Sequence, residues 1–260
     1  MKKLSIKNSL RYKDYEKSMG INMDEIIFSA VGEQGIAVLF EQKISEETNG
    51  KIRFLMEKLR KRKEIREMIP AFCSLLVFYD CRKISYSRMK RILEKEAAGL
   101  LAVKSGQKKI HIIPVCYGDT FGEDIGYVSE YTGLKEEEII RLHCGRDYLI
   151  YMLGFLPGFA YLGGLDERIF CPRLESPRTR IMAGSIGIGG EQTGIYPLDS
   201  PGGWRLIGKT PLRPYDVHRN PPILYKMGDY IRFQSVTSDE YDEISAKVEQ
   251  GIYKHRCITQ

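Results

Sequence analysis

Residues that build disulfides and local metal sites are few and scattered in this sequence. The six cysteines form no C-x-x-C pair, and the four histidines lie far from one another along the chain. This distribution excludes a sequence-local zinc motif and does not suggest a disulfide framework. We therefore expect reduced, mostly buried thiols and no metal or organic cofactor held by this chain alone. The cysteines are Cys73, Cys81, Cys116, Cys144, Cys171 and Cys257.

Long apolar runs are absent as well. No stretch of about 18 consecutive apolar residues occurs, which excludes an ordinary membrane-spanning helix. The N-terminus begins with lysines but has no apolar segment behind them, so it does not resemble a secretory signal. We expect a cytoplasmic protein.

The net charge of +6 is concentrated in the first 20 residues and in EKLRKRKEIRE, residues 57–67. A basic cluster of this kind is compatible with nucleic-acid binding. However, glutamates interleave with the cations and aromatic residues are missing, which favours a solvated helix face. We expect neither a nucleic acid nor a membrane as a partner.

The first part of the chain has the alternation of a small α+β domain. After a basic N-terminal extension, residues 1–22, the pattern predicts the order β-β-α-β-β-α over residues 23–104. Pro70 favours an edge strand or a strand end, and Ser87 is a candidate N-cap. The segments are strands at 25–32 and 35–40, a helix with Ile52, Leu55, Met56 and Leu59 on one face, strands at 66–72 and 73–80, and a helix with Met89, Ile92, Leu93 and Ala97 on one face.

The polar segment SGQKK, residues 105–109, predicts a linker, and the pattern changes after it. A strand at 110–118 precedes two short helices, at 124–133 and 135–145, with Gly145 placed to cap the second. A strand at 147–155 follows, and short apolar runs between glycines and prolines continue to residue 235. This texture predicts a β-barrel domain over 108–238. Residues 239–260 form a C-terminal helix or tail.

The glycine-rich stretch 187–211 contains a match to the phosphate-loop pattern, at residues 203–210. That motif requires a loop followed directly by a helix, whose N-terminus holds the phosphates. Here Pro211 and Pro214 follow the match, and WRLIGKT alternates like a strand. We therefore predict that Lys209 and Thr210 lie at a strand end and do not bind a nucleotide.

Four segments together resemble one protein family. They are CSLLVFYD (73–80), YMLGFLPGFAYLGGLD (151–166), PRTRIMAGSIGI (177–188) and EQTGIYPLDSPGGWRLIGKTP (191–211). In order and spacing they are similar to the B subunit of the three-part prokaryotic 5-oxoprolinase, a family that includes KipI-like proteins and is related to the carboxyltransferase region of urea carboxylases. The resemblance implies an α+β fold with a small N-terminal α+β domain followed by a cyclophilin-like β-barrel domain.

The resemblance also implies a reaction, the ATP-dependent opening of the cyclic amide 5-oxo-L-proline to L-glutamate. It implies a direct partner, the C subunit, and a further partner, the A subunit, with ATP used by the assembled complex and this chain inactive alone. Activation of the lactam by ATP needs hydrogen-bond donors around the developing negative oxygen and positive charge at the phosphoryl group. The chain departs from many family members at Met182, where they have proline, and at Lys209, where arginine is frequent.

The resemblance and the residue types together give a set of candidate site residues. Gln192 and Tyr196 are interpreted as catalytic, as is His143, whose place in the last turn of a helix favours a protonated ring. The alternative for His143 is a helix-end histidine bonded within the fold. Gly202 and Gly203 either line a ligand or form a hairpin turn, with Trp204 plugging the barrel. The candidate substrate-binding residues are Tyr151, Phe155, Arg178, Ser185, Thr193, Gly202, Gly203 and Trp204.

Two other functions share the predicted fold, so the fold alone does not decide between them. One is a KipI-like regulatory protein that inhibits a sporulation-type histidine kinase. The other is a carboxyltransferase-type protein that acts on urea-like amides.

Overall fold

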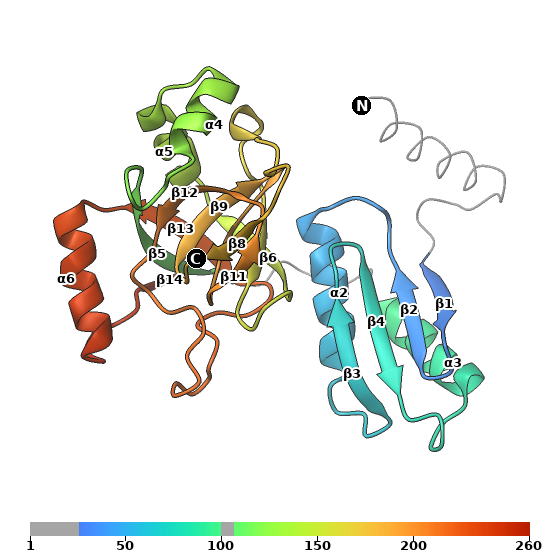
Figure 1. The fold of residues 1–260 in the computed structure, drawn as a ribbon. Coiled ribbons are helices and arrows are strands. Elements are labelled where there is room, and N and C mark those ends of the chain that lie inside the picture. Colours follow the sequence, from blue (N-terminus) through green and yellow to red (C-terminus); the bar gives the residue numbers. More distant parts are fainter. Residues whose placement is uncertain (1–25, 100–106) are drawn as a thin grey trace. The chain divides into compact units, whose positions relative to one another are not determined.

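The computed structural model describes residues 26–99 and 107–260, and the chain divides into two compact units, 1–103 and 104–260 (Figure 1). The predicted N-terminal extension, residues 1–22, lies outside the described residues, as does the start of the predicted linker.

The N-terminal unit has the predicted order of strands and helices. Its antiparallel sheet has the strand order β1-β2-β4-β3, so Pro70 ends an edge strand. One prediction is wrong: helix α3 is capped by Ser85, which accepts the backbone N–H of Arg88, and Ser87 lies inside the first turn. The elements are β1 (Ile27–Val31), β2 (Gly35–Leu39), α2 (Glu46–Leu59), β3 (Ile65–Pro70), β4 (Ser74–Tyr79) and α3 (Tyr86–Ala97).

Two amphipathic helices and the central strands form the core of this unit. Ile52, Leu55 and Leu59 of α2 are fully buried, as are Met89 and Leu93 of α3. These residues recur at helical spacing, which is why their sequence pattern predicts both helices. Strands β2 and β4 contribute Ile36, Val38, Leu75 and Val77.

The C-terminal unit is a closed β-barrel, as predicted. Its strands follow the order β12-β9-β10-β7-β6-β13-β5, and pairing of β12 with β5 closes the ring. Two further strands, β8 and β11, form a separate ribbon. The elements are β5 (Lys109–Tyr117), α4 (Ile125–Thr132), α5 (Glu136–Cys144), β6 (Tyr148–Leu153), β7 (Ala160–Gly163), η2 (Glu167–Ile169), β8 (Arg178–Ile181), β9 (Ser185–Gly189), β10 (Gln192–Ile195), β11 (Ser200–Gly202), β12 (Arg205–Lys209), β13 (Tyr230–Ser235), α6 (Ser238–Glu249) and β14 (Cys257–Thr259).

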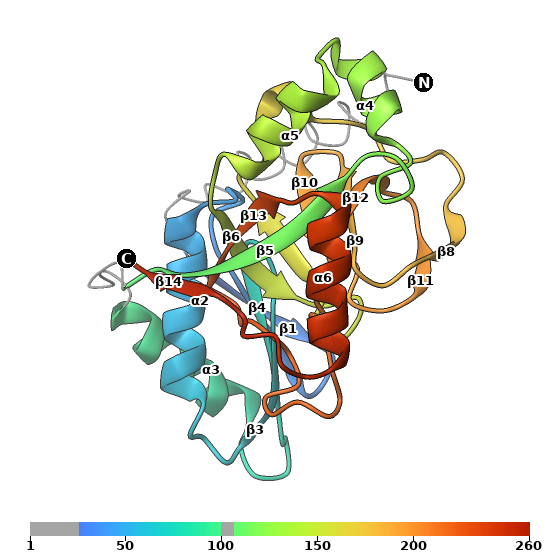
Figure 2. The same cartoon turned by 90° about the vertical axis from the view of Figure 1, so that its left-hand side faces the viewer.

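Strand β5 holds this unit together, because it pairs with three other strands. It runs parallel to β13, and it pairs antiparallel with β12 near its end and with β14 near its start. Figure 2 shows β14 at the C-terminus alongside β5. The C-terminal segment is thus a helix, α6, followed by a barrel-attached strand that the sequence did not predict.

Three helices flank the barrel. Figures 1 and 2 show α4 and α5 together at one end of it and α6 along its side. Gly133 ends α4 in the left-handed conformation, whereas Gly145, the predicted cap of α5, has φ −77° and is not left-handed. Within the part of the chain that the structure describes, no helix combines the length and apolar character needed to cross a bilayer.

Candidate functional site

The glycines of the stretch 187–211 provide a flat surface for the tryptophan. A Cβ on Gly187 would lie 3.0 Å from Cβ of Trp204, and a Cβ on Gly194 would lie 3.0 Å from its Cζ3. A Cβ on Gly189 would overlap the indole Nε1. Each glycine therefore leaves space that a side chain would fill, and this allows the indole to lie directly against the backbone of the strands.

The indole lies on the outer face of the barrel. Ile186 and Ile188 alternate with the glycines on β9 and belong to the barrel core. Successive residues of a strand point to opposite faces, so Gly187 and Gly189 face away from that core. The alternative in which Trp204 plugs the barrel is therefore wrong, because the residue packs outside in a second cluster.

This second cluster contains two of the predicted site residues, Tyr196 and Trp204, and a third, Phe155, packs against it. Phe159 is at its centre, with ring centroids 5.3 Å from Tyr196, 5.5 Å from Trp204 and 5.5 Å from Phe155. Phe155 is 62% exposed and has φ +68°, a left-handed conformation that is strained for a bulky residue. Phe159 thus connects the buried rings of Tyr196 and Trp204 to the exposed and strained Phe155.

Tyr196 is held inside the cluster. It is buried, and burial raises the pKa of its phenol, so the hydroxyl stays protonated at neutral pH. A Cβ on Gly202 would lie 2.6 Å from that hydroxyl. Gly202 is part of strand β11 and pairs with Arg178, so the alternative of a hairpin turn at Gly202 is wrong.

The guanidinium of Arg178 is engaged within the fold. Its Nη2 donates to Asp124 Oδ1 at 2.9 Å, and its Nε lies 3.1 Å from Glu123 Oε1. The other oxygen of Asp124 accepts the backbone N–H of Leu206 at 2.7 Å. Asp124, as the main partner, raises the pKa of Arg178. The guanidinium predicted to bind substrate therefore joins strand β8 to Asp124, the residue that precedes α4. Asp124 in turn joins this pair to strand β12.

His143 forms the middle of a buried hydrogen-bond chain. Its Nδ1 lies 2.7 Å from the hydroxyl of Tyr117, and its Nε2 lies 2.8 Å from Oγ1 of Thr193. Because the Thr193 hydroxyl donates to the carbonyl of Gly187 at 3.0 Å, it accepts from Nε2–H, which fixes the tautomer. The ring also stacks on Phe233 at 4.5 Å.

The expectation of a protonated His143 is wrong. Burial lowers its pKa to about 3, because the desolvation of a charged ring outweighs the favourable field of the helix end. His143 and Thr193 are both fully buried, and Thr193 lies on strand β10. The structure thus brings these two predicted residues into direct hydrogen-bond contact in the interior of the unit.

This neutral ring predicts a pH-dependent stability. Folding lowers the pKa of His143, so the unfolded chain binds the proton more tightly than the folded chain. The contribution to stability is complete above about pH 6.5 and declines as the pH falls toward 3. The urea midpoint should fall less steeply across this range in His143→Asn than in the parent protein. Exposed His218→Asn should keep the parent slope, and an unchanged slope in His143→Asn would contradict this account.

The other predicted residues lie on three strands of the barrel, β6, β9 and β10. Gln192 begins β10 opposite Gly189, whereas Tyr196 follows the other end of that strand, about 13 Å away at the usual rise per residue. Ser185 is buried on β9 opposite Lys209. Tyr151 is buried against Gly163 of the neighbouring strand β7. The backbone carbonyl of Ser185 accepts the N–H of Tyr196 at 2.9 Å, and the partner of Gln192, Gly189, lies directly under the indole of Trp204. Ser185 and Gln192 therefore adjoin different parts of the aromatic cluster, whereas Tyr151 packs on β7.

The segment that matched the phosphate loop is a strand and its end, as predicted. Lys209 is the last residue of β12. Thr210 is buried, donates its backbone N–H to the carbonyl of Gly184 at 2.9 Å, and accepts the N–H of Leu212 on its hydroxyl. No helix follows within the described residues 211–229, so the phosphate-binding geometry is missing there.

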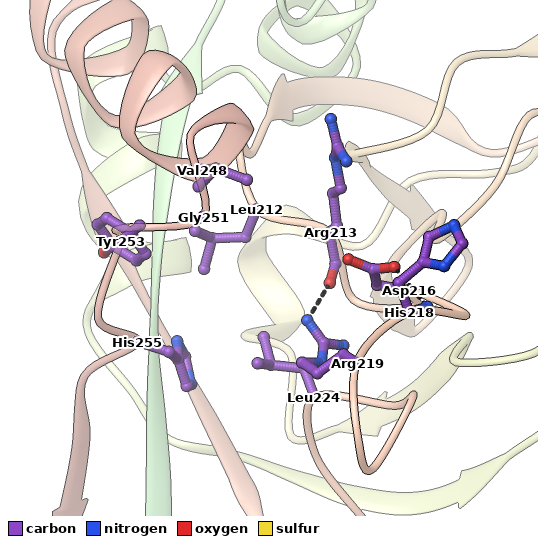
Figure 3. Close-up of a pocket in the computed structure, with 10 residues that line it drawn as sticks. All are labelled: Leu212, Arg213, Asp216, His218, Arg219, Leu224, Val248, Gly251, Tyr253 and His255. Atoms are coloured by element: carbon purple, nitrogen blue, oxygen red, sulfur yellow. Dashed lines mark hydrogen bonds between the residues drawn. The ribbon is translucent and has the colours of Figure 1, made fainter.

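A cavity of about 390 Å³ lies elsewhere on the C-terminal unit, and none of its lining residues is among the site residues predicted from the sequence (Figure 3). The loop after β12 supplies Arg213, Asp216 and Arg219, and the segment after α6 supplies Tyr253 and His255. Arg219 donates to the carbonyl of Arg213 at 2.9 Å, so its charge organises the loop. The only sequence signal was the polar run between the prolines of this loop.

Comparison with known proteins gives consistent matches. Residues 26–225 match the family described as carboxyltransferase domain, subdomain C and D. The chain is 39% identical to the 5-oxoprolinase B subunit of Bacillus subtilis, with 81% of this chain and 93% of that protein covered. It is 36% identical to the 5-oxoprolinase B subunit of Escherichia coli O157:H7, with 78% and 93% covered.

Solved structures share the fold. The crystal structure of TTHA0988 has a TM-score of 0.71 and 35% identity, with 79% of this chain covered. This chain spans 40% of the TTHA0988 chain. Urea amidolyase of K. lactis has a TM-score of 0.75 over 92% of this chain, and at 18% identity this likeness concerns the fold alone.

Proposed function

The chain belongs to the B-subunit family of 5-oxoprolinases, which are carboxyltransferase-domain proteins, and from this membership we propose that it is the B subunit of an ATP-dependent 5-oxoprolinase. The complex would open 5-oxo-L-proline to L-glutamate, with the C subunit in direct contact with this chain and the A subunit in the complex as a further component. The observation that carries the proposal is the similarity to two B-subunit proteins across 93% of the length of each.

The arrangement of side chains supports a divided active site. Among the described residues, the candidate acid–base group His143 is buried and neutral, and the candidate anion-binding fork of Arg178 is paired with carboxylates. Phosphoryl transfer requires positive charge or metal ions at the phosphates. These groups of this chain are already engaged in its own fold, so we propose that partner subunits supply most of the phosphate-binding charge.

Phe155 is the candidate contact with the complex. It is exposed, its backbone is strained, and its ring packs on the buried cluster that contains Tyr196 and Trp204. Strained residues of this kind cluster at functional sites. We propose that Phe155 is covered by the C subunit in the complex, and that Gln192 and Gly203 contribute polar and backbone contacts to the composite site.

The test is co-purification of this chain with the C subunit from the same organism. A stable complex is expected on size exclusion at micromolar concentration, because obligate interfaces bury more than about 2,000 Å². Phe155→Asp should weaken the complex, since a charge would be desolvated there. Val217→Asp, at a position 68% exposed on the loop after β12, is the matched control and should leave the complex intact. Separate elution of the two unmodified chains would count against the proposal.

A further inference from the structure

The closing strand β14 brings together three metal-ligand side chains that are scattered in the sequence. His111 on β5 and Cys257 on β14 are directly paired in the antiparallel register. His255 lies two residues before Cys257, which places both side chains on the same face of the extended chain. The backbone N–H of Ile112 donates to the carbonyl of Arg256, so the pairing continues between these two ligands.

The ligand atoms converge on one point. His111 Nδ1 lies 2.9 Å from His255 Nε2 and 3.4 Å from Cys257 Sγ. All three atoms lie within 4.8 Å of one another. Tetrahedral zinc with Zn–N of about 2.0–2.1 Å and Zn–S of about 2.3 Å separates its ligand atoms by about 3.3–3.6 Å. An opening of a few tenths of an ångström brings the two histidine nitrogens to the separation that zinc requires.

A buried carboxylate orients the central histidine. Asp229 Oδ2 lies 3.0 Å from His111 Nε2, and both side chains are almost fully buried. The same oxygen accepts the backbone N–H of Lys226 at 3.2 Å, which holds the carboxylate in place. A carboxylate that accepts Nε2–H leaves the Nδ1 lone pair directed at the other two ligands, the usual support of a metal-bound histidine.

We propose that His111, His255 and Cys257 form a binding site for a borderline divalent transition-metal ion, with Zn²⁺ as the occupant that fits best. Two imidazoles and one thiolate suit this ion, whereas calcium and magnesium prefer oxygen ligands. Cys257 is exposed, so a water molecule can complete the tetrahedron. The ion would join β14 to β5 and thereby fix the C-terminal segment to the barrel.

The site is independent of the proposed reaction. His255 and Cys257 lie beyond residues 26–225, the part that matches the carboxyltransferase family. His255 also lines the cavity of Figure 3, and its Nδ1 is buried without a hydrogen-bond partner among the described residues.

The test is titration of the reduced, metal-free full chain with Co²⁺, followed by displacement with Zn²⁺. One equivalent of Co²⁺ should produce intense visible bands of a tetrahedral site together with a thiolate-to-cobalt charge-transfer band, and Zn²⁺ should remove both. Cys257→Ser should abolish the charge-transfer band, while Cys81→Ser, which removes another exposed thiol, should retain it. Asp229→Asn should weaken binding by about 10–100-fold, as expected for a positioning residue.

Circular dichroism in the far ultraviolet serves as the folding control for each variant. Two results would overturn the proposal. One is the absence of these bands in the unmodified chain, and the other is an unchanged charge-transfer band in folded Cys257→Ser.

Discussion

Replacement of Trp204 by alanine is expected to lower the free energy of unfolding of the C-terminal unit by about 3–5 kcal/mol. Trp204 is 5% exposed and packs on Phe159 and Tyr196. The surface below it consists of glycines, which have no side chains that could move into the space. The cavity left by the substitution therefore cannot collapse, and such cavities carry the largest costs.

Urea denaturation followed by far-ultraviolet circular dichroism measures this effect, because Trp204 is the only tryptophan and its fluorescence is lost in the variant. Trp204→Phe should recover part of the loss, since an aromatic ring still covers the glycines. Val217→Ala should change the stability by less than about 0.5 kcal/mol, as exposed positions usually do. A loss below about 1 kcal/mol in Trp204→Ala would show that the indole is not packed as described.

Replacement of Asp124 by alanine is expected to lower the free energy of unfolding by about 1–3 kcal/mol, because it leaves a buried backbone N–H without its acceptor. Its side chain is 9% exposed and accepts hydrogen bonds from Arg178 and from the backbone N–H of Leu206. Without the carboxylate, the guanidinium loses its main partner and the buried N–H loses its acceptor. The first loss weakens the contact of the α4 start with strand β8, and the second weakens its contact with strand β12.

The matched control is Glu123→Ala, because Glu123 also pairs with Arg178 but is 58% exposed. An exposed ion pair is worth about 0–1 kcal/mol, so the control should have a small effect on the urea midpoint. Asp124→Asn should fall between the two, since the amide oxygen can still accept from Leu206. Equal losses in Glu123→Ala and Asp124→Ala would contradict the buried role of Asp124.

The architecture could be predicted where the signal is local. The helices of the N-terminal unit follow from apolar residues at helical spacing, and the strand character of the phosphate-loop match follows from Pro211 and the alternation before it. The cap of α3 was misplaced by two residues, because Ser85 and Ser87 both have the composition of a cap and only the backbone conformation distinguishes them.

The candidate site could be predicted less well because its contacts are long-range. His143 meets Tyr117 and Thr193, which are 26 and 50 residues away in the sequence. Only the barrel closure brings them together, and the resulting burial reverses the charge state expected from the helix end. The sequence pattern did not predict strand β14 for the same reason. Its partner β5 is the first strand of the C-terminal unit in the sequence, and β14 is the last.

The most direct test of the proposed role in a 5-oxoprolinase is 5-oxoproline-dependent ATP hydrolysis by the reconstituted complex. The A and C subunits of the same organism are assayed with and without this chain, and the chain is also assayed alone. We predict that glutamate formation and ATP hydrolysis require all three chains. Robust turnover by this chain alone, or an equal rate from the A and C subunits without it, would contradict the account.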